Sequence, residues 1–297
     1  MVFPARFPGR LRARGSAAAL ALVGAGLALA CARYDLDISR ALVQPEAGWA
    51  AFGQRYGELP GVYVFALAAV AGHARPARPE AQPKLARELP WLLCSIAVAI
   101  ALALSAYRLF DYRLGKLEVA ATWAVTLLAT RIWRRWLGAG LRLRPGWERA
   151  RLWTLRLGIW SWLVVSVLKL GWGRVRYRDL TPLARDFTPW YSPQGWSGHS
   201  SFPSGHAVLG WLLLPSLLIW PPGSPGYRWA FAASFGWGVF VASSRVVIGA
   251  HYLSDVLFSS ALVFAVMAFA LGRAGNVAAE GDQRADAGRT APLEDGR

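Results

Sequence analysis

The stretch from residue 152 to residue 176 reads LWTLRLGIWSWLVVSVLKLGWGRVR. Its first part, 152–169, is almost entirely apolar, and its length is close to the roughly 20 residues that a helix needs to cross a bilayer. The run ends on Lys169, and Arg174 and Arg176 follow directly. Charges at the edge of a membrane helix are costly unless they have a task. This stretch therefore predicts a membrane helix that delivers cationic side chains to a functional site.

Further apolar stretches of similar length surround this one. The chain has 297 residues, of which 55% are hydrophobic, and this composition excludes an ordinary soluble domain. We predict an all-α fold, a polytopic membrane helical bundle with a six-helix catalytic domain over residues 89–272 and about two extra N-terminal helices. The other five spans of that domain are predicted at 89–109, 117–135, 206–221, 229–244 and 252–272.

The regions on either side of this domain are less regular. Residues 1–15 are basic and are expected in the cytoplasm, and 273–297 are predicted to be a disordered tail because they lack apolar periodicity. Between 16 and 88 we expect additional membrane segments and a linker. The run from Ser16 to Ala32 is consistent with a first span or with a signal peptide cleaved after Ala30, and 57–74 is a weaker span candidate.

The net charge of +16 does not indicate a nucleic-acid partner, because the arginines cluster in short loops between apolar runs. Seven arginines lie in residues 131–151 against the single acidic residue Glu148. Positive loops of this kind stay in the cytoplasm. The helix over 152–169 then carries Lys169 to the outer face, and the loops 170–205 and 245–251 lie on that same face.

Two further blocks complete an ordered polar set. Pro203-Ser204-Gly205-His206 opens one apolar stretch, and Arg245, His251 and Asp255 stand at the junction of the next two. Ser204 is a good helix N-cap, and helix N-termini bind phosphate through free N–H groups. Gly205 allows the backbone to approach the oxygens closely. A phosphoryl group in transfer spreads charge over three oxygens, so positioned cations are the main catalytic tool.

This order of blocks resembles the type 2 phosphatidic acid phosphatase (PAP2) superfamily, the membrane lipid-phosphate phosphatases related to vanadium haloperoxidases. The resemblance implies that His251 is the nucleophile that becomes phosphohistidine, Asp255 orients it, and His206 is the general acid. It implies a phosphate site made by Lys169, Arg176, Ser204, Gly205 and Arg245. Arg174 is assigned a supporting role. Tyr177 departs from the family pattern, which has proline after the arginine, and this puts the loop geometry in question.

A metal site built from His206, His251 and Asp255 is the main chemical rival, since neutral imidazole is a common ligand. It is disfavoured because Lys169 and the two arginines would repel a divalent cation, so no cofactor and no metal are expected. A lipid phosphotransferase with the same residues, or a non-catalytic transporter or scaffold, stays open as an alternative.

The expected partners are the bilayer and a phosphorylated lipid, which is a phosphate or diphosphate monoester. The sequence leaves open which lipid this is and what the oligomeric state of the protein is. The expected location is the bacterial inner (plasma) membrane, with the active site facing outward.

Overall fold

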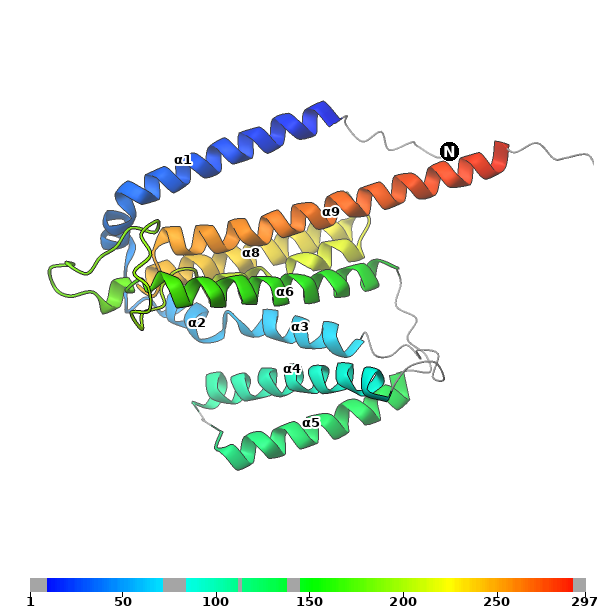
Figure 1. The fold of residues 1–297 in the computed structure, drawn as a ribbon, viewed down its shortest axis with the longest axis horizontal. Coiled ribbons are helices and arrows are strands. Elements are labelled where there is room, and N and C mark those ends of the chain that lie inside the picture. The colour runs from blue at the N-terminus through cyan, green and yellow to red at the C-terminus, as the bar shows by residue number, and fades with distance from the viewer. Residues whose placement is uncertain (1–9, 72–83, 112–113, 138–144, 291–297) are drawn as a thin grey trace, which may run out of the picture.

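The computed structural model describes residues 10–71, 84–111, 114–137 and 145–290, and within these ranges every regular element is helical. Long helices run side by side along one common direction (Figure 1), which confirms the predicted helical bundle. In chain order the elements are α1 (Arg10–Leu42), α2 (Gly48–Tyr56), α3 (Leu59–Ala71), α4 (Lys84–Phe110), α5 (Lys116–Leu137), α6 (Pro145–Trp172), η2 (Tyr177–Asp179), α7 (Gly205–Trp211), η3 (Leu214–Ile219), α8 (Pro225–Val247) and α9 (Leu253–Thr290).

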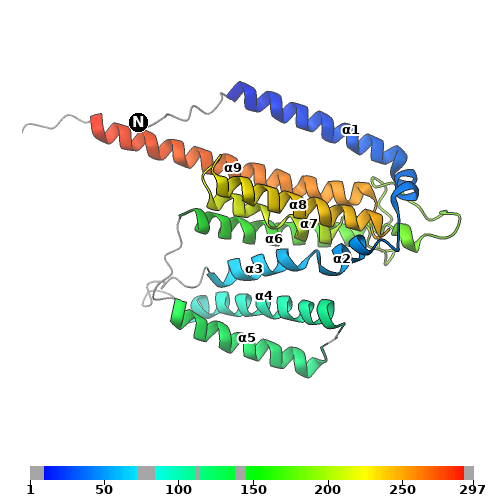
Figure 2. The same cartoon turned by 180° about the vertical axis from the view of Figure 1, so that it is seen from behind.

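Helices α6, α7, α8 and α9 form the centre of the bundle. The hairpin of α4 and α5 lies along one edge beyond α3, and α1 lies along the opposite edge next to α9 (Figures 1 and 2). The central helices bury a cluster that includes Leu157, Val208, Trp211, Leu212 and Val263, each at most 4% exposed. This core ties the helices that carry the three polar blocks into one body.

The outside of the bundle is apolar. Four helices within the described residues are long and apolar enough to cross a membrane: Leu92–Phe110, Gly146–Asp179, Pro225–Val247 and Leu253–Leu271. Large apolar side chains point outward from them, among them Trp160 at 62% and Trp229 at 76% exposure. A water-soluble protein does not expose so much apolar surface, so the protein is an integral membrane protein.

The stretch 206–221 was predicted to be one span, and the structure divides it. The helix α7 stops at Trp211, and the chain continues through the 3-10 helix η3. Pro215 explains the break, because proline lacks an N–H donor and its ring clashes with the carbonyl four residues earlier. Leu214 and Leu217 are buried at 3% and 5% exposure, so surrounding helices cover this interrupted segment.

The N-terminal run Ser16–Ala32 becomes the first part of α1, which continues past the possible cleavage site to Leu42. Residues 72–74 of the weaker candidate 57–74 lie outside the described part, and within its described residues this candidate becomes α3, whose 13 residues extend about 20 Å. That is shorter than a bilayer core of about 30 Å. This short helix packs against α4, α6 and α7, so its position is set by protein contacts.

Two predicted non-helical regions are described only in part. Of the predicted linker 75–88, residues 75–83 lie outside the described residues, and α4 already begins at Lys84. The helix α9 continues to Thr290, which differs from the disordered tail predicted from residue 273. The added part is rich in alanine, the strongest helix former.

Candidate active site

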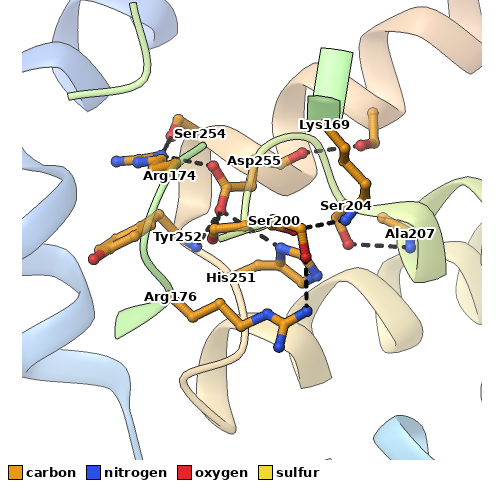
Figure 3. Close-up of polar contacts among 12 residues, drawn as sticks. Lys169, Arg174, Arg176, Ser200, Ser204, Ala207, His251, Tyr252, Ser254 and Asp255 are labelled. Carbon is orange, nitrogen blue, oxygen red and sulfur yellow. Dashed lines mark hydrogen bonds and ion pairs between the residues drawn. The ribbon is translucent and has the colours of Figure 1, made fainter. Parts of the chain in front are cut away.

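The three polar blocks meet at one end of the bundle. Lys169 lies at the end of α6, His206 in the first turn of α7, and Arg245 at the end of α8, while His251 and Asp255 frame the start of α9. The long loop between α6 and α7 covers the same end (Figure 1). Figure 3 shows how the side chains of Lys169, Arg176, His251 and Asp255 lie close together there. The sequence-predicted residues thus form one site.

Asp255 is the most heavily bonded member of the site. It is fully buried, and its Oδ1 accepts from Arg174 Nη1 at 2.6 Å. Its Oδ2 accepts from Ser201 Oγ at 2.5 Å and from the backbone N–H of Tyr252 at 3.0 Å. Because Tyr252 directly precedes α9, this last bond is the reciprocal half of a capping box. The carboxylate is therefore fixed from three directions.

His251 lies outside α9, so it does not share a helix face with Asp255 as their four-residue spacing had indicated. Its backbone N–H donates to the carbonyl of Arg245 at 3.1 Å in the turn that joins α8 to α9. Its Nδ1 lies 3.5 Å from Asp255 Oδ2, within ion-pair range but longer than a hydrogen bond. The carboxylate faces Nδ1, and this leaves Nε2 as the nitrogen available for chemistry.

The imidazole of His251 is only 3% exposed. Burial lowers its pKa from the ordinary 6.5 to about 4, against the opposing effect of Asp255 and with the cations Arg245 and Lys169 adding to the decrease. His251 is therefore uncharged at neutral pH, as a nucleophile or a metal ligand must be.

The cations surround the space beside His251. Lys169 Nζ donates to the carbonyl of Ser200 at 2.6 Å, and Arg176 Nη2 lies 3.2 Å from Ser200 Oγ. Arg245 is 4% exposed and donates to Gln54 Oε1 at 3.2 Å. The Nε atoms of Arg176 and Arg245 are buried and have no hydrogen-bond partner among the described residues. Buried donors of this kind require an acceptor, and an anion with several oxygens suits them.

The start of α7 has the predicted cap. Ser204 is the N-cap, and its side chain accepts from the N–H of Ala207 at 3.4 Å. A Cβ atom added to Gly205 would meet only Val165, at an ordinary 3.9 Å. No protein contact therefore demands glycine, and its predicted role beside an anion stays a prediction. The next residue, His206, has its Nε2 3.1 Å from Glu58 Oε2.

Arg174, assigned a supporting role from the sequence, is completely buried. Its guanidinium binds Asp255 and also Asp35, whose Oδ2 accepts from Nη2 at 2.8 Å. The aromatic ring of Tyr252 stacks on it, with 3.9 Å between Cζ and the ring centroid. These contacts give Arg174 a structural task behind Asp255 rather than a place among the phosphate-facing cations.

Tyr177 stands where proline was expected. It is the first residue of η2, and helix-like turns accept either residue there because the N–H needs no partner within the turn. Its ring contacts Tyr252 edge to face at 6.3 Å between centroids. The substitution therefore keeps the turn and adds an aromatic contact next to His251.

The site residues that the sequence did not predict include Ser200, Ser201 and Tyr252. Four more come from the N-terminal part of the chain: Asp35, Gln54, Glu58 and Arg108. Asp35 and Glu58 are 1% and 6% exposed. Asp35 follows one apolar run and Glu58 precedes another. An acidic residue inside a membrane region is by default a functional candidate. That signal was available, but the sequence alone does not tell which cation each acid meets.

The donor set suits an anion better than a metal. Within the described residues, no group of three or more His, Cys, Asp or Glu side chains is arranged to hold a metal ion. Lys169, Arg176 and Arg245 approach the same space as His251, and three positive charges favour phosphate oxygens. The arrangement can therefore hold an anion such as phosphate beside a neutral imidazole.

Comparisons with known proteins find matches over part of the chain. The model of the PAP2 superfamily matches residues 150–276, from α6 to the middle of α9. The lipid A 1-phosphatase of Rhizobium etli is 35% identical over 103 residues, which make up 33% of this chain. The matched part spans about two fifths, 39%, of that relative's length. No solved structure matches the chain.

Proposed function

Residues 150–276 belong to the PAP2 superfamily, and from this premise we propose that the protein is a membrane phosphatase. It hydrolyses a phosphate or diphosphate monoester of a lipid at the outer face of the membrane. One observation carries the proposal. Arg176 and Arg245 each have a buried Nε without a partner among the described residues, beside the neutral, buried His251. A phosphoryl group supplies the missing acceptors and places phosphorus next to the nucleophile.

In the first step, Nε2 of His251 attacks phosphorus. The N–P bond forms while the bond from phosphorus to the lipid oxygen breaks, and His206 gives a proton to the departing oxygen. Asp255 stabilises the positive charge that develops on the ring of His251. Lys169, Arg176 and Arg245 stabilise the charge that spreads over the equatorial oxygens.

In the second step, His206 accepts a proton from water, and the water oxygen attacks phosphorus. The N–P bond breaks, inorganic phosphate leaves, and both imidazoles return to their starting states. The general acid of the first step is thus the general base of the second, as microscopic reversibility requires.

The outward orientation follows from charge. The arginine-rich segment 131–151 runs from the end of α5 to the first turns of α6, and the site lies at the other end of α6. Since positive loops remain in the cytoplasm, the site opens to the outer face. The lipid reaches it from the outer leaflet, because the apolar outside of the bundle contacts acyl chains.

The test is phosphate release by purified, detergent-solubilised protein from four substrates: phosphatidic acid, phosphatidylglycerol phosphate, undecaprenyl diphosphate and lipid A. Lipid A is included because the Rhizobium etli relative is named for it. We expect release from at least one of them, loss of turnover in His251→Ala, slow turnover in Asp255→Asn, and an acid-labile phosphoenzyme in the wild type. Undiminished turnover in His251→Ala contradicts the mechanism. Transfer of phosphate to an added lipid or sugar, without release, identifies a phosphotransferase.

A further inference from the structure

A buried carboxylate contacts the general acid from outside the family match. Glu58 lies between α2 and α3 and is 6% exposed. Its Oε2 is 3.1 Å from Nε2 of His206, and its Oε1 accepts from Arg108 Nε at 2.8 Å and from Nη2 of the same arginine. Arg108 Nη2 also lies 3.3 Å from His206 Nε2. The three side chains form one cluster, which we call the Glu58 cluster.

Arg108 pairs with the Glu58 carboxylate through two of its nitrogens. A guanidinium that donates from two nitrogens to a buried carboxylate offsets the cost of burying that carboxylate. Arg108 is itself held in place, because its carbonyl oxygen accepts from Arg55 Nε at 2.6 Å. The cluster therefore holds a carboxylate oxygen in a fixed position next to the ring of His206.

The helices α2 and α3, which flank Glu58, pack closely against α7 and α8 at three glycines with four-residue spacing. A Cβ added to Gly61 would come within 2.1 Å of the backbone oxygen of Leu209. One added to Gly57 would be 2.8 Å from Val241, and one added to Gly53 would be 2.5 Å from Ser244. Small residues at this spacing allow membrane helices to approach closely.

The closest of these approaches, Gly61 to Leu209, determines how Glu58 and His206 lie relative to each other. Gly61 follows Glu58 by three residues, and Leu209 follows His206 by three residues. The contact between Gly61 and Leu209 therefore sets the first turns of α3 and α7 side by side, with Glu58 opposite His206. This packing therefore keeps the Glu58 carboxylate beside the ring of His206.

We propose that Glu58, held by Arg108, is a positioning residue that orients His206 for proton transfer to the leaving group. This inference rests on the proposed phosphatase function. A protonated imidazole has two N–H donors. Glu58 accepts from one, and the other is given to the lipid oxygen as its bond to phosphorus breaks. Glu58 keeps its charge throughout, and the proton is regained from water in the second step.

The test separates proton donation from general damage by changing the leaving group. An alkoxide leaves only with a proton, whereas p-nitrophenoxide leaves without one. We compare kcat/KM for dodecyl phosphate and for p-nitrophenyl phosphate in the same micelles, because kcat/KM reports the steps up to the first bond cleavage. Glu58→Gln should lower kcat/KM for dodecyl phosphate by about a hundredfold, the lower end of general-acid contributions. The value for p-nitrophenyl phosphate should fall by less than about threefold.

Three further variants complete the experiment. Glu58→Asp keeps the charge and should recover part of the dodecyl phosphate activity. Glu148→Gln removes a carboxylate from another glutamate–arginine pair, with Arg151 at 2.8 Å at the far end of α6, and should leave both values unchanged. If Glu58→Gln does not fold, the double variant Glu58→Gln/Arg108→Gln removes both charges together and is measured in its place.

The outcomes are distinct. An equal loss on both substrates overturns the positioning role, because misfolding or a distorted phosphate site affects both alike. Unchanged activity on dodecyl phosphate overturns it as well. A wild-type protein that cleaves neither compound and none of the four lipids contradicts the proposed function itself.

Discussion

Asp35 Oδ2 accepts a hydrogen bond from Arg174 Nη2 at 2.8 Å, although the two residues are 139 positions apart in the chain. Both side chains are fully buried, and the other arm of the same guanidinium holds Asp255 at 2.6 Å. Asp35 also accepts from the backbone N–H of Ser254 at 3.1 Å. Helix α1 therefore braces the carboxylate that faces His251, and it does so from outside the part of the chain that matches the family.

We expect Asp35→Asn to reduce both stability and turnover. Loss of one carboxylate leaves a buried guanidinium only partly compensated, and removal of one partner from a buried ion pair costs about 3–5 kcal/mol. Without the charge of Asp35, the guanidinium of Arg174 would also change its position relative to Asp255. Thermal unfolding in detergent and kcat on the preferred lipid are the measurements. The matched control is Asp37→Asn, whose carboxylate is 65% exposed and pairs with Arg40 on the surface.

His251 should make folding stability sensitive to acid. Its pKa of about 4 in the folded protein is below the ordinary 6.5 because the ring is buried. The folded state thus prefers the neutral ring, and this contribution to stability is complete above pH 6.5 and is lost as the pH falls towards 4. The midpoint of thermal unfolding should decrease over this window, and less so in His251→Gln. Identical pH dependence in both proteins would refute the assignment.

Arg176→Lys and Arg245→Lys should each lower kcat/KM by at least about tenfold, or about 1.4 kcal/mol of transition-state binding. Lysine keeps the charge but not the planar fork that binds two oxygens. Arg174→Lys should affect stability as well as activity. Its two carboxylates and its stacking on Tyr252 predict a fall in the melting temperature together with lower activity. Steady-state kinetics and thermal unfolding in one detergent distinguish the two patterns.

Catalysis should not need a metal ion, since cationic side chains occupy the positions around the phosphate. We expect full activity after dialysis against EDTA and inhibition by vanadate, which mimics five-coordinate phosphorus. If chelation abolishes activity and one divalent ion restores it, catalysis needs a metal ion, and the cationic side chains have another role.

The outward orientation predicts a labelling pattern for single cysteines. Gln194 lies in the exposed loop at the active-site end, and Arg149 is exposed near the start of α6. Gln194→Cys should react with a membrane-impermeant maleimide in intact spheroplasts, and Arg149→Cys only after lysis. The native Cys31 and Cys94 are each 2% exposed, so they contribute little background. The reverse pattern would place the site in the cytoplasm.

Local pattern was sufficient for most of the helices but not for their interruptions. The apolar runs at 89–109 and 152–169 became the long helices α4 and α6, because runs of this length have no alternative in a membrane but to bond their own backbone. The run 206–221 was equally apolar, yet Pro215 divided it. Its burial by neighbouring helices, which permits such a break, is not visible in the run itself.

The sequence by itself determined the helical class, the order of the polar blocks and the residue types of the site. Lys169, Arg176, His206, Arg245 and His251 stand out because charge is rare in apolar runs, and a rare feature is informative wherever it occurs. The tertiary structure alone decided which acids accompany them. Asp35 and Glu58 meet Arg174 and His206 only because α1 and α3 pack against distant helices. Such contacts depend on complementary helix surfaces, such as Gly61 against Leu209, and no local periodicity encodes the partner.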